Sequence, residues 1–153
     1  MSAVEAIEIR ALEVPDIDAA TEISIASFPP GAERPEFGDE LGRSIARVHV
    51  ACIDGAVVGY VLGWFAADQA EILSIAVHPH RRTRGVGRAL LDHFVATVAQ
   101  YGASHVLLEV RASNGAAIAL YEAKGLVRMG RRKKYYADGE DALTYRLELS
   151  PPR

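Results

Sequence analysis

Apolar and polar residues alternate with a period of two through much of the first half of the chain, as expected for half-buried strands. Residues 6–12 alternate in this way, and apolar positions spaced as in a helix follow from Pro15 to Ser27. The segment 28–38 is rich in proline and glycine, which predicts a long loop. After it we expect a helix over 36–46 and strands over 48–53, 56–65 and 70–77, with a hairpin at Asp54-Gly55.

The second half opens with a helical period. Val86, Leu90, Phe94 and Val98 recur at every fourth position, which predicts a helix over 85–101 that packs on a sheet. The elements expected after it are a strand over 106–110, a helix over 114–124 and two strands over 126–136 and 142–149, joined around Asp138-Gly139.

The predicted order is therefore β α α β β β α β α β β. Antiparallel hairpins come first and a strand–helix–strand crossover follows, which predicts an α/β fold with one mixed, mostly antiparallel sheet of about seven strands and about four flanking helices. A chain of 153 residues that is half apolar is long enough for one core, so we expect a single domain over 1–153.

Composition excludes several classes of protein. The chain has no apolar run of about 18 residues and no secretory leader in its first 25 residues, so we expect a cytoplasmic protein without membrane contact. Cys52, the one cysteine, lies in an apolar strand and is expected in the core. His78 and His80 lack an acidic or cysteine partner at ligand spacing, so no metal is expected.

Charge is unevenly distributed. Residues 1–80 carry 13 acidic and 4 basic side chains, whereas residues 81–153 carry 7 acidic and 13 basic ones. The two parts therefore have net charges of −9 and +6, and the whole chain has −3. The basic part suits an anionic partner, and either a polyphosphate cofactor or a nucleic-acid backbone would fit.

A basic, glycine-containing loop joins the strand over 70–77 to the following helix. Glycine lets a ligand approach the backbone, and the first N–H groups of a helix are unpaired and carry partial positive charge. This arrangement favours a pyrophosphate. The loop lacks the third glycine of G-x-G-x-x-G, and the chain has no G-K-[ST] sequence, so neither nucleotide motif fits.

The pattern R-x-x-G-x-G, formed by Arg82, Gly85 and Gly87, resembles the acetyl-coenzyme-A loop of the GCN5-related N-acetyltransferases. Residues 107–114, 116–121 and 125–126 are similar to the second half of that family's cofactor site. Within the family the resemblance is closest to ribosomal-protein-alanine N-acetyltransferases of the RimI type. It covers residues 70–149 closely and residues 1–69 in outline.

This resemblance implies the fold of that family and acetyl-CoA as co-substrate. It implies that residues 75–77 pair with the pantetheine arm, that residues 82–88 hold the pyrophosphate, and that Asn114 binds the pantetheine. The implied cofactor-binding residues are Ile75, Ala76, Val77, Arg82, Thr83, Arg84, Gly85, Val86, Gly87, Arg88, Asn114 and Tyr121.

Acetyl transfer to an amine needs a neutral amine and a proton for the departing thiolate. The resemblance implies Glu109 as general base, directly or through a water, and Tyr121 as the acid. The residues alone leave alternatives open: Glu109 could be a surface glutamate paired with Arg111, and Tyr121 could be a packed helix aromatic.

The acceptor follows from similar reasoning. At pH 7 roughly 10% of N-terminal amines but under ~0.1% of lysine amines are neutral. One carboxylate of moderately raised pKa is therefore a sufficient general base for a protein N-terminus. The resemblance implies the N-terminal alanine of a small-subunit ribosomal protein, bound by Phe28, Pro29, Tyr135 and Tyr136. Relatives often have Phe-Pro-Trp where this chain has Phe28-Pro29-Pro30, which leaves the acceptor open.

Three other functions remain open at the level of sequence. They are acetylation of a lysine or small amine, a silent acetyl-CoA sensor, and a non-enzymatic module that binds phosphate or nucleic acid. The basic run 131–134 would serve the last of these, although we expect nucleic acid only through the ribosome. We expect a monomer or a weak homodimer.

Overall fold

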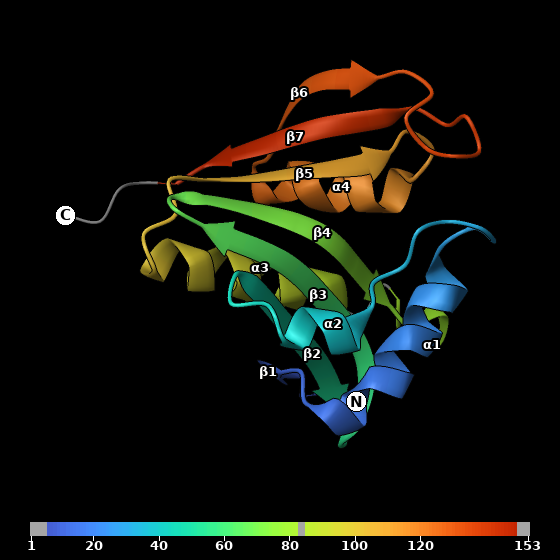
Figure 1. Cartoon of the computed structure of the whole chain (residues 1–153), viewed down its shortest axis with the longest axis vertical. Helices are drawn as coiled ribbons and strands as arrows, with labels where there is room; N and C mark the ends of the chain where they lie inside the picture. Colours follow the sequence, from blue (N-terminus) through green and yellow to red (C-terminus); the bar gives the residue numbers. More distant parts are fainter. Residues whose placement is uncertain (1–5, 83–84, 150–153) are drawn as a thin grey trace, which may run out of the picture.

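A computed structural model describes residues 6–82 and 85–149 and contains one seven-stranded sheet in the order β1-β2-β3-β4-β5-β7-β6 (Figure 1). Neighbouring strands are antiparallel except β4 and β5, which are parallel. The α/β fold class is confirmed. The strands are β1 Glu8–Ala11, β2 Ala46–Ile53, β3 Ala56–Ala66, β4 Gln69–Val77, β5 His105–Arg111, β6 Val127–Arg132 and β7 Ala142–Glu148.

Helices cover both faces of the sheet. The α-helices are α1 Ile17–Ser27, α2 Phe37–Leu41, α3 Val86–Gln100 and α4 Gly115–Lys124, with short 3-10 turns η1 Val14–Asp16 and η2 Pro79–Arg81. Figure 1 shows α1 and α2 on the near face and α3 on the far face.

The apolar side of α3 packs as the sequence pattern predicts. Val86, Leu90, Phe94 and Val98 are all buried. A Cβ atom at Gly63 of β3 would lie 2.2 Å from the Phe94 ring, so the glycine allows that ring to rest on the sheet. On the opposite face of the sheet, another cluster of buried apolar side chains joins α1 and α2 to β2 and β3. It includes Cys52, which is buried as expected.

The two central strands separate partway along their length. Pairing of β4 with β5 begins at Gln69 and His105 and ends at Ile72 and Leu108. In the pairing with β3, Ser74 is opposite Leu62 and Ile72 is opposite Gly63, so Leu73 is the extra residue of a β-bulge. Beyond it, the two strands diverge (Figure 1), and the β4 backbone facing β5 no longer has a ladder partner.

Two predicted elements are wrong in extent. The helix expected over 36–46 ends at Leu41, because Gly42 follows and β2 begins at Ala46. The strand expected over 126–136 ends at Arg132. Lys134 has φ 51°, a turn conformation, and its N–H donates to Asp141 Oδ1 at 2.9 Å. The adjacent tyrosines 135 and 136 therefore lie in the β6–β7 loop rather than in a strand.

Candidate active site

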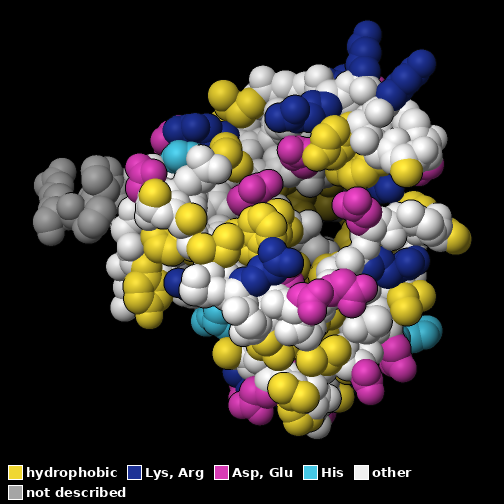
Figure 2. Space-filling view, in the orientation of Figure 1, with side chains coloured by type: hydrophobic (Ala, Val, Ile, Leu, Met, Phe, Trp, Pro, Cys, Tyr) yellow, Lys and Arg dark blue, Asp and Glu magenta, His cyan; other side chains and the backbone are white. Residues whose placement is uncertain are grey.

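A cavity of about 1030 Å³ opens where β4 and β5 separate. Its walls are the loop after α1 with part of α2, the diverging strands, and the β6–β7 loop. Figure 2 shows this hollow, with acidic side chains on both sides of it. The cavity brings together seven residues that the sequence proposed for the site: Phe28, Ile75, Glu109, Asn114, Tyr121, Tyr135 and Tyr136. Pro29 is exposed and does not line it.

Glu109 lies on β5 directly after the last residue that pairs with β4. Its side chain is 26% exposed, and Oε1 lies 3.7 Å from Nε of Arg132. The Oε2 atom is buried and has no hydrogen-bond partner among residues 6–82 and 85–149. Burial of an unpaired carboxylate oxygen is unfavourable, so a ligand that donates an N–H or O–H would complete this position.

The alternative in which Glu109 pairs with Arg111 is wrong. The Arg111 guanidinium donates instead to Asp138 and Glu140 in the β6–β7 loop, at 2.7 and 3.2 Å. Asp138 and Glu140 therefore bind Arg111, the cationic residue nearest to Glu109 on β5. Glu109 therefore lines the cavity with one oxygen unpartnered among the described residues.

Tyr121 lies on α4, is 4% exposed and lines the same cavity. Burial, with smaller contributions from Tyr136 and Tyr60, raises the pKa of Tyr121 well above the usual value for a phenol. The hydroxyl therefore stays protonated at neutral pH and is a proton donor. Its ring centroid lies 6.4 Å from that of Tyr145, so the side chain also has the packing role that the sequence left open.

The glycine-containing loop leads into α3. Gly85 has φ +83° and caps the helix, which leaves the first N–H groups of α3 without intrahelical partners. Arg82 donates from Nε to the Val77 carbonyl at 3.1 Å and from its guanidinium to Ser27 Oγ at 3.2 Å. Thr83 and Arg84 lie outside the described residues.

The end of β4 connects this loop to the cavity. Ile75 lines the cavity, Ala76 is buried, and Val77 lies beside the start of α3, where a Cβ at Gly87 would be 3.7 Å from Val77 Cγ2. The unpaired β4 backbone and the open helix end fit an extended ligand that carries phosphate at one end. Three further cofactor candidates are also placed: Val86 is buried in the first turn of α3, Arg88 pairs with Asp92 at 3.1 Å, and Asn114 caps α4 by accepting from Ala117 N–H at 3.2 Å.

Gly87→Ala tests the cofactor loop. The Cβ would meet only ordinary contacts at 3.4 Å and beyond, so we expect unchanged or slightly higher thermal stability. It would occupy space beside the end of β4, and we expect the KM for acetyl-CoA to rise about tenfold. Gly38→Ala is the control, because Gly38 is also the second residue of a helix with open space around it. Equal KM values for both variants would contradict the assignment.

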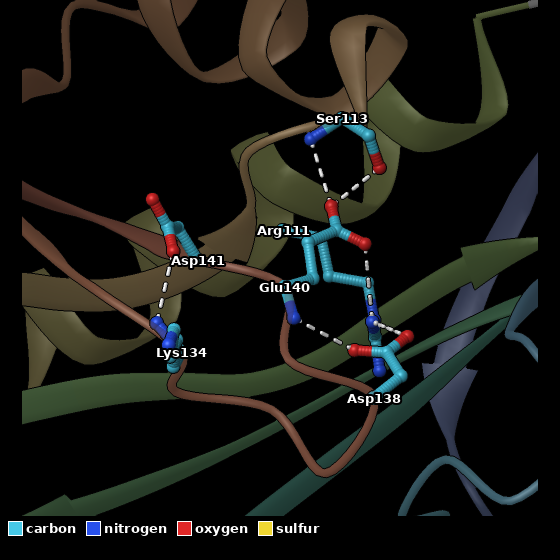
Figure 3. Close-up of polar contacts among 6 residues, drawn as sticks. All are labelled: Arg111, Ser113, Lys134, Asp138, Glu140 and Asp141. Atoms are coloured by element: carbon cyan, nitrogen blue, oxygen red, sulfur yellow. Dashed lines mark hydrogen bonds and ion pairs between the residues drawn. The ribbon is translucent and has the colours of Figure 1, made fainter.

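An ion-pair cluster holds the β6–β7 loop against β5 (Figure 3). Arg111, 13% exposed, contacts Asp138 and Glu140, and Glu140 also accepts from the Ser113 N–H at 2.9 Å. The Arg111 guanidinium lies 4.1 Å from the centroid of the Tyr136 ring. This cluster was not predicted from the sequence. Three acidic residues in one hairpin loop, at 138, 140 and 141, were the available signal.

Arg111→Met removes the cation from this cluster. We expect a lower melting temperature, because two carboxylates lose their partner, and about a tenfold higher KM for the acceptor, because Tyr136 is no longer held. The control is Arg10→Met, which breaks the pair of Arg10 with Asp16 at 2.6 Å, away from the cavity. Thermal melting and acceptor titration measure both effects. An acceptor KM that rises equally in both variants would show a general loss of stability instead.

Within the part of the chain that the structure describes, no helix is long and apolar enough to cross a membrane. The same residues contain no cluster of three or more His, Cys, Asp or Glu side chains able to hold a metal ion.

Residues 17–126 match the acetyltransferase (GNAT) family, and the chain belongs to that family. It is an N-acetyltransferase that uses acetyl-CoA, as the sequence resemblance implied. It is 34% identical over 145 residues to the [ribosomal protein bS18]-alanine N-acetyltransferase of Escherichia coli K12, covering 93% of this chain and 97% of the relative. An N-alpha-acetyltransferase of Sulfurisphaera tokodaii is 34% identical over 147 residues and covers 88% of each chain.

A solved structure agrees with the fold. The crystal structure of the ribosomal-protein-S18-alanine N-acetyltransferase from Escherichia coli matches with a TM-score of 0.85 and 32% identity, over 97% of each chain. The family resemblance drawn from the sequence is thus confirmed, and the match over residues 17–126 extends it into the part before residue 70, where the sequence carried it only in outline.

Proposed function

We propose that this enzyme transfers the acetyl group of acetyl-CoA directly to the N-terminal amine of a protein, and that the acceptor is the N-terminal alanine of a small-subunit ribosomal protein. The observation that carries the proposal is the buried, unpartnered Oε2 of Glu109 on the cavity wall. The names of the relatives from Escherichia coli and Sulfurisphaera tokodaii, an alanine N-acetyltransferase and an N-alpha-acetyltransferase, support the same acceptor class.

In this proposal each requirement of the reaction has a residue. Glu109 accepts a proton from the acceptor ammonium, directly or through a water, and leaves a neutral amine. The amine nitrogen forms a bond to the thioester carbon while the carbon–sulfur bond breaks, and Tyr121 gives its proton to the departing thiolate. The second proton, which the nitrogen loses as the amide forms, restores the Tyr121 hydroxyl, and Glu109 releases the first proton to solvent. Unpaired N–H groups of β4 beyond the bulge polarise the thioester oxygen. Residues 75–77, the loop 82–88 and Asn114 bind the cofactor.

The acceptor peptide lies between Phe28 on one side of the cavity and the tyrosine pair 135 and 136 on the other. Pro29 does not contact the peptide but fixes the turn after Phe28, because its carbonyl accepts a hydrogen bond from the Ala32 N–H at 3.1 Å. The chain works as one domain over 1–153, as a monomer or weak homodimer in the cytoplasm, and meets nucleic acid only through the ribosome. The sheet that joins β1 to β6 supports a single domain.

Intact-mass analysis of synthetic peptides tests this function. One peptide has a free N-terminal alanine and an internal lysine, and its control has the same sequence with a blocked N-terminus. We expect a single acetyl group on the first peptide and none on the second. Acetylation of the blocked peptide, or of a polyamine at a comparable rate, would establish a side-chain or small-amine acceptor instead. A panel that varies the first residue then tests the preference for alanine.

A further inference from the structure

A second carboxylate, Glu71, lies beside Glu109 at the point where β4 and β5 separate. Glu71 is opposite Trp64 of β3 and Leu107 of β5. Alternate residues of a strand share a face, so Leu107 and Glu109 point to the same side of the sheet as Glu71. Both carboxylates line the cavity. Glu71 comes just before the end of the paired region, and Glu109 comes just after it.

No cation in the described part of the chain balances Glu71. It makes no hydrogen bond or ion pair there, whereas Glu109 has Arg132 at 3.7 Å. Trp64, its neighbour on β3, donates to Glu40 of α2 at 2.8 Å, and Arg43 pairs with that same Glu40. The Tyr135 phenol interacts mainly with Glu109 and more weakly with Glu71. Arg132, which is mostly exposed, is therefore the cation paired with one of these two carboxylates, and Glu71 has none among the described residues.

The two neighbouring carboxylates lower the folding stability of the free enzyme at neutral pH. Burial, and then the charge of Glu109, raises the pKa of Glu71 above its usual value. A carboxyl group whose pKa is raised by folding favours the folded state less as pH rises through that pKa, so ionised Glu71 opposes folding at neutral pH. Carboxylates kept in such a position are typical of sites that bind or transform a ligand. A cationic ligand would relieve the repulsion.

We propose that Glu71 binds the protonated acceptor amine beside Glu109 and thereby determines how strongly the enzyme holds its acceptor. This inference rests on the proposed function, in which the acceptor is an amine. N-terminal amines have a pKa near ~7.8, so most of them arrive as ammonium at pH 7. Glu71 attracts that cation, Glu109 takes the proton, and Glu71 then accepts a hydrogen bond from the neutral amine.

Glu71→Gln keeps the shape of the side chain and removes its charge. At pH 7 we expect the KM for an N-terminal-alanine peptide to rise about tenfold, with kcat changed less than about threefold. The ratio of the variant and wild-type KM values should fall toward one by about pH 9, where the amine is neutral. Glu71→Asp should restore part of the affinity. The melting temperature of Glu71→Gln should equal or exceed that of the wild type at pH 7.

Glu148→Gln is the control, because it also removes one negative charge from the sheet but does not line the cavity. Its acceptor KM should stay within about twofold of the wild type. An unchanged acceptor KM in Glu71→Gln, a KM ratio that does not vary with pH, or a lower melting temperature would each overturn the role of Glu71. If the wild-type enzyme acetylates no N-terminal peptide, it is the proposed function that fails.

Discussion

Glu109→Gln is expected to lower kcat for an N-terminal-alanine peptide by about 10²–10⁴-fold at pH 7, the range associated with loss of a general base. Glutamine has nearly the same shape but cannot accept the amine proton. The loss should be largest below pH 8, where the acceptor arrives protonated, and smaller above pH 9, where the free amine is already abundant. Steady-state rates measured across this pH range, with saturating acetyl-CoA, give the comparison.

Two controls make this result specific to the base. The KM for acetyl-CoA should stay within about twofold in Glu109→Gln, because the loop 82–88 and the first turn of α3 are unchanged. Glu148→Gln, which removes the same charge away from the cavity, should keep wild-type kcat. If Glu109→Gln retained most of its activity, or kept the wild-type pH profile at reduced rate, Glu109 would not be the base.

Tyr121→Phe is expected to lower kcat by about 10- to 100-fold, because the departing thiolate loses its proton donor. Burial holds the pKa of Tyr121 well above the usual value, so the wild-type hydroxyl remains a donor throughout the neutral range. Within the described residues that hydroxyl makes no hydrogen bond. The phenylalanine variant should therefore keep both the packing on Tyr145 and the wild-type melting temperature.

Tyr145→Phe is the matched control. Tyr145 is also buried, but its hydroxyl donates to Glu122 at 2.7 Å and does not line the cavity. Removing that hydroxyl should cost about 1 kcal/mol of stability and leave kcat nearly unchanged. The opposite pattern, with loss of activity in Tyr145→Phe and a loss of stability alone in Tyr121→Phe, would assign Tyr121 a structural role only.

Elements that depend on local sequence could be predicted. The apolar period of Val86, Leu90, Phe94 and Val98 defined α3, because that signal arises within one helix. The anion site that the glycines at 85 and 87 indicate at its start stays a prediction. The hairpin at Asp54-Gly55 is confirmed for the same reason: both residues have positive φ there, as a tight two-residue turn requires.

Features that depend on distant partners could not be located from the local sequence. Nothing in the alternation of residues 70–77 marks Leu73 as a bulge, since the extra residue is defined only by its pairing with β3. Arg111 and its partners at 138 and 140 are 27 and 29 residues apart, and the turn that moves Tyr135 out of the strand depends on Asp141. The neighbourhood of Glu71 and Glu109 likewise follows from strand order rather than from spacing.

The central claim is that the opening between β4 and β5 brings a thioester and an N-terminal amine together at Glu109. A crystal structure with a conjugate of coenzyme A and an alanine peptide, joined through an acetyl group, tests it most directly. We expect the linking carbon between the two strands, the peptide nitrogen within hydrogen-bonding distance of the Glu109 carboxylate, and the peptide passing between Phe28 and Tyr135. A conjugate whose peptide nitrogen lies away from Glu109, or whose pyrophosphate lies away from the start of α3, would contradict the claim.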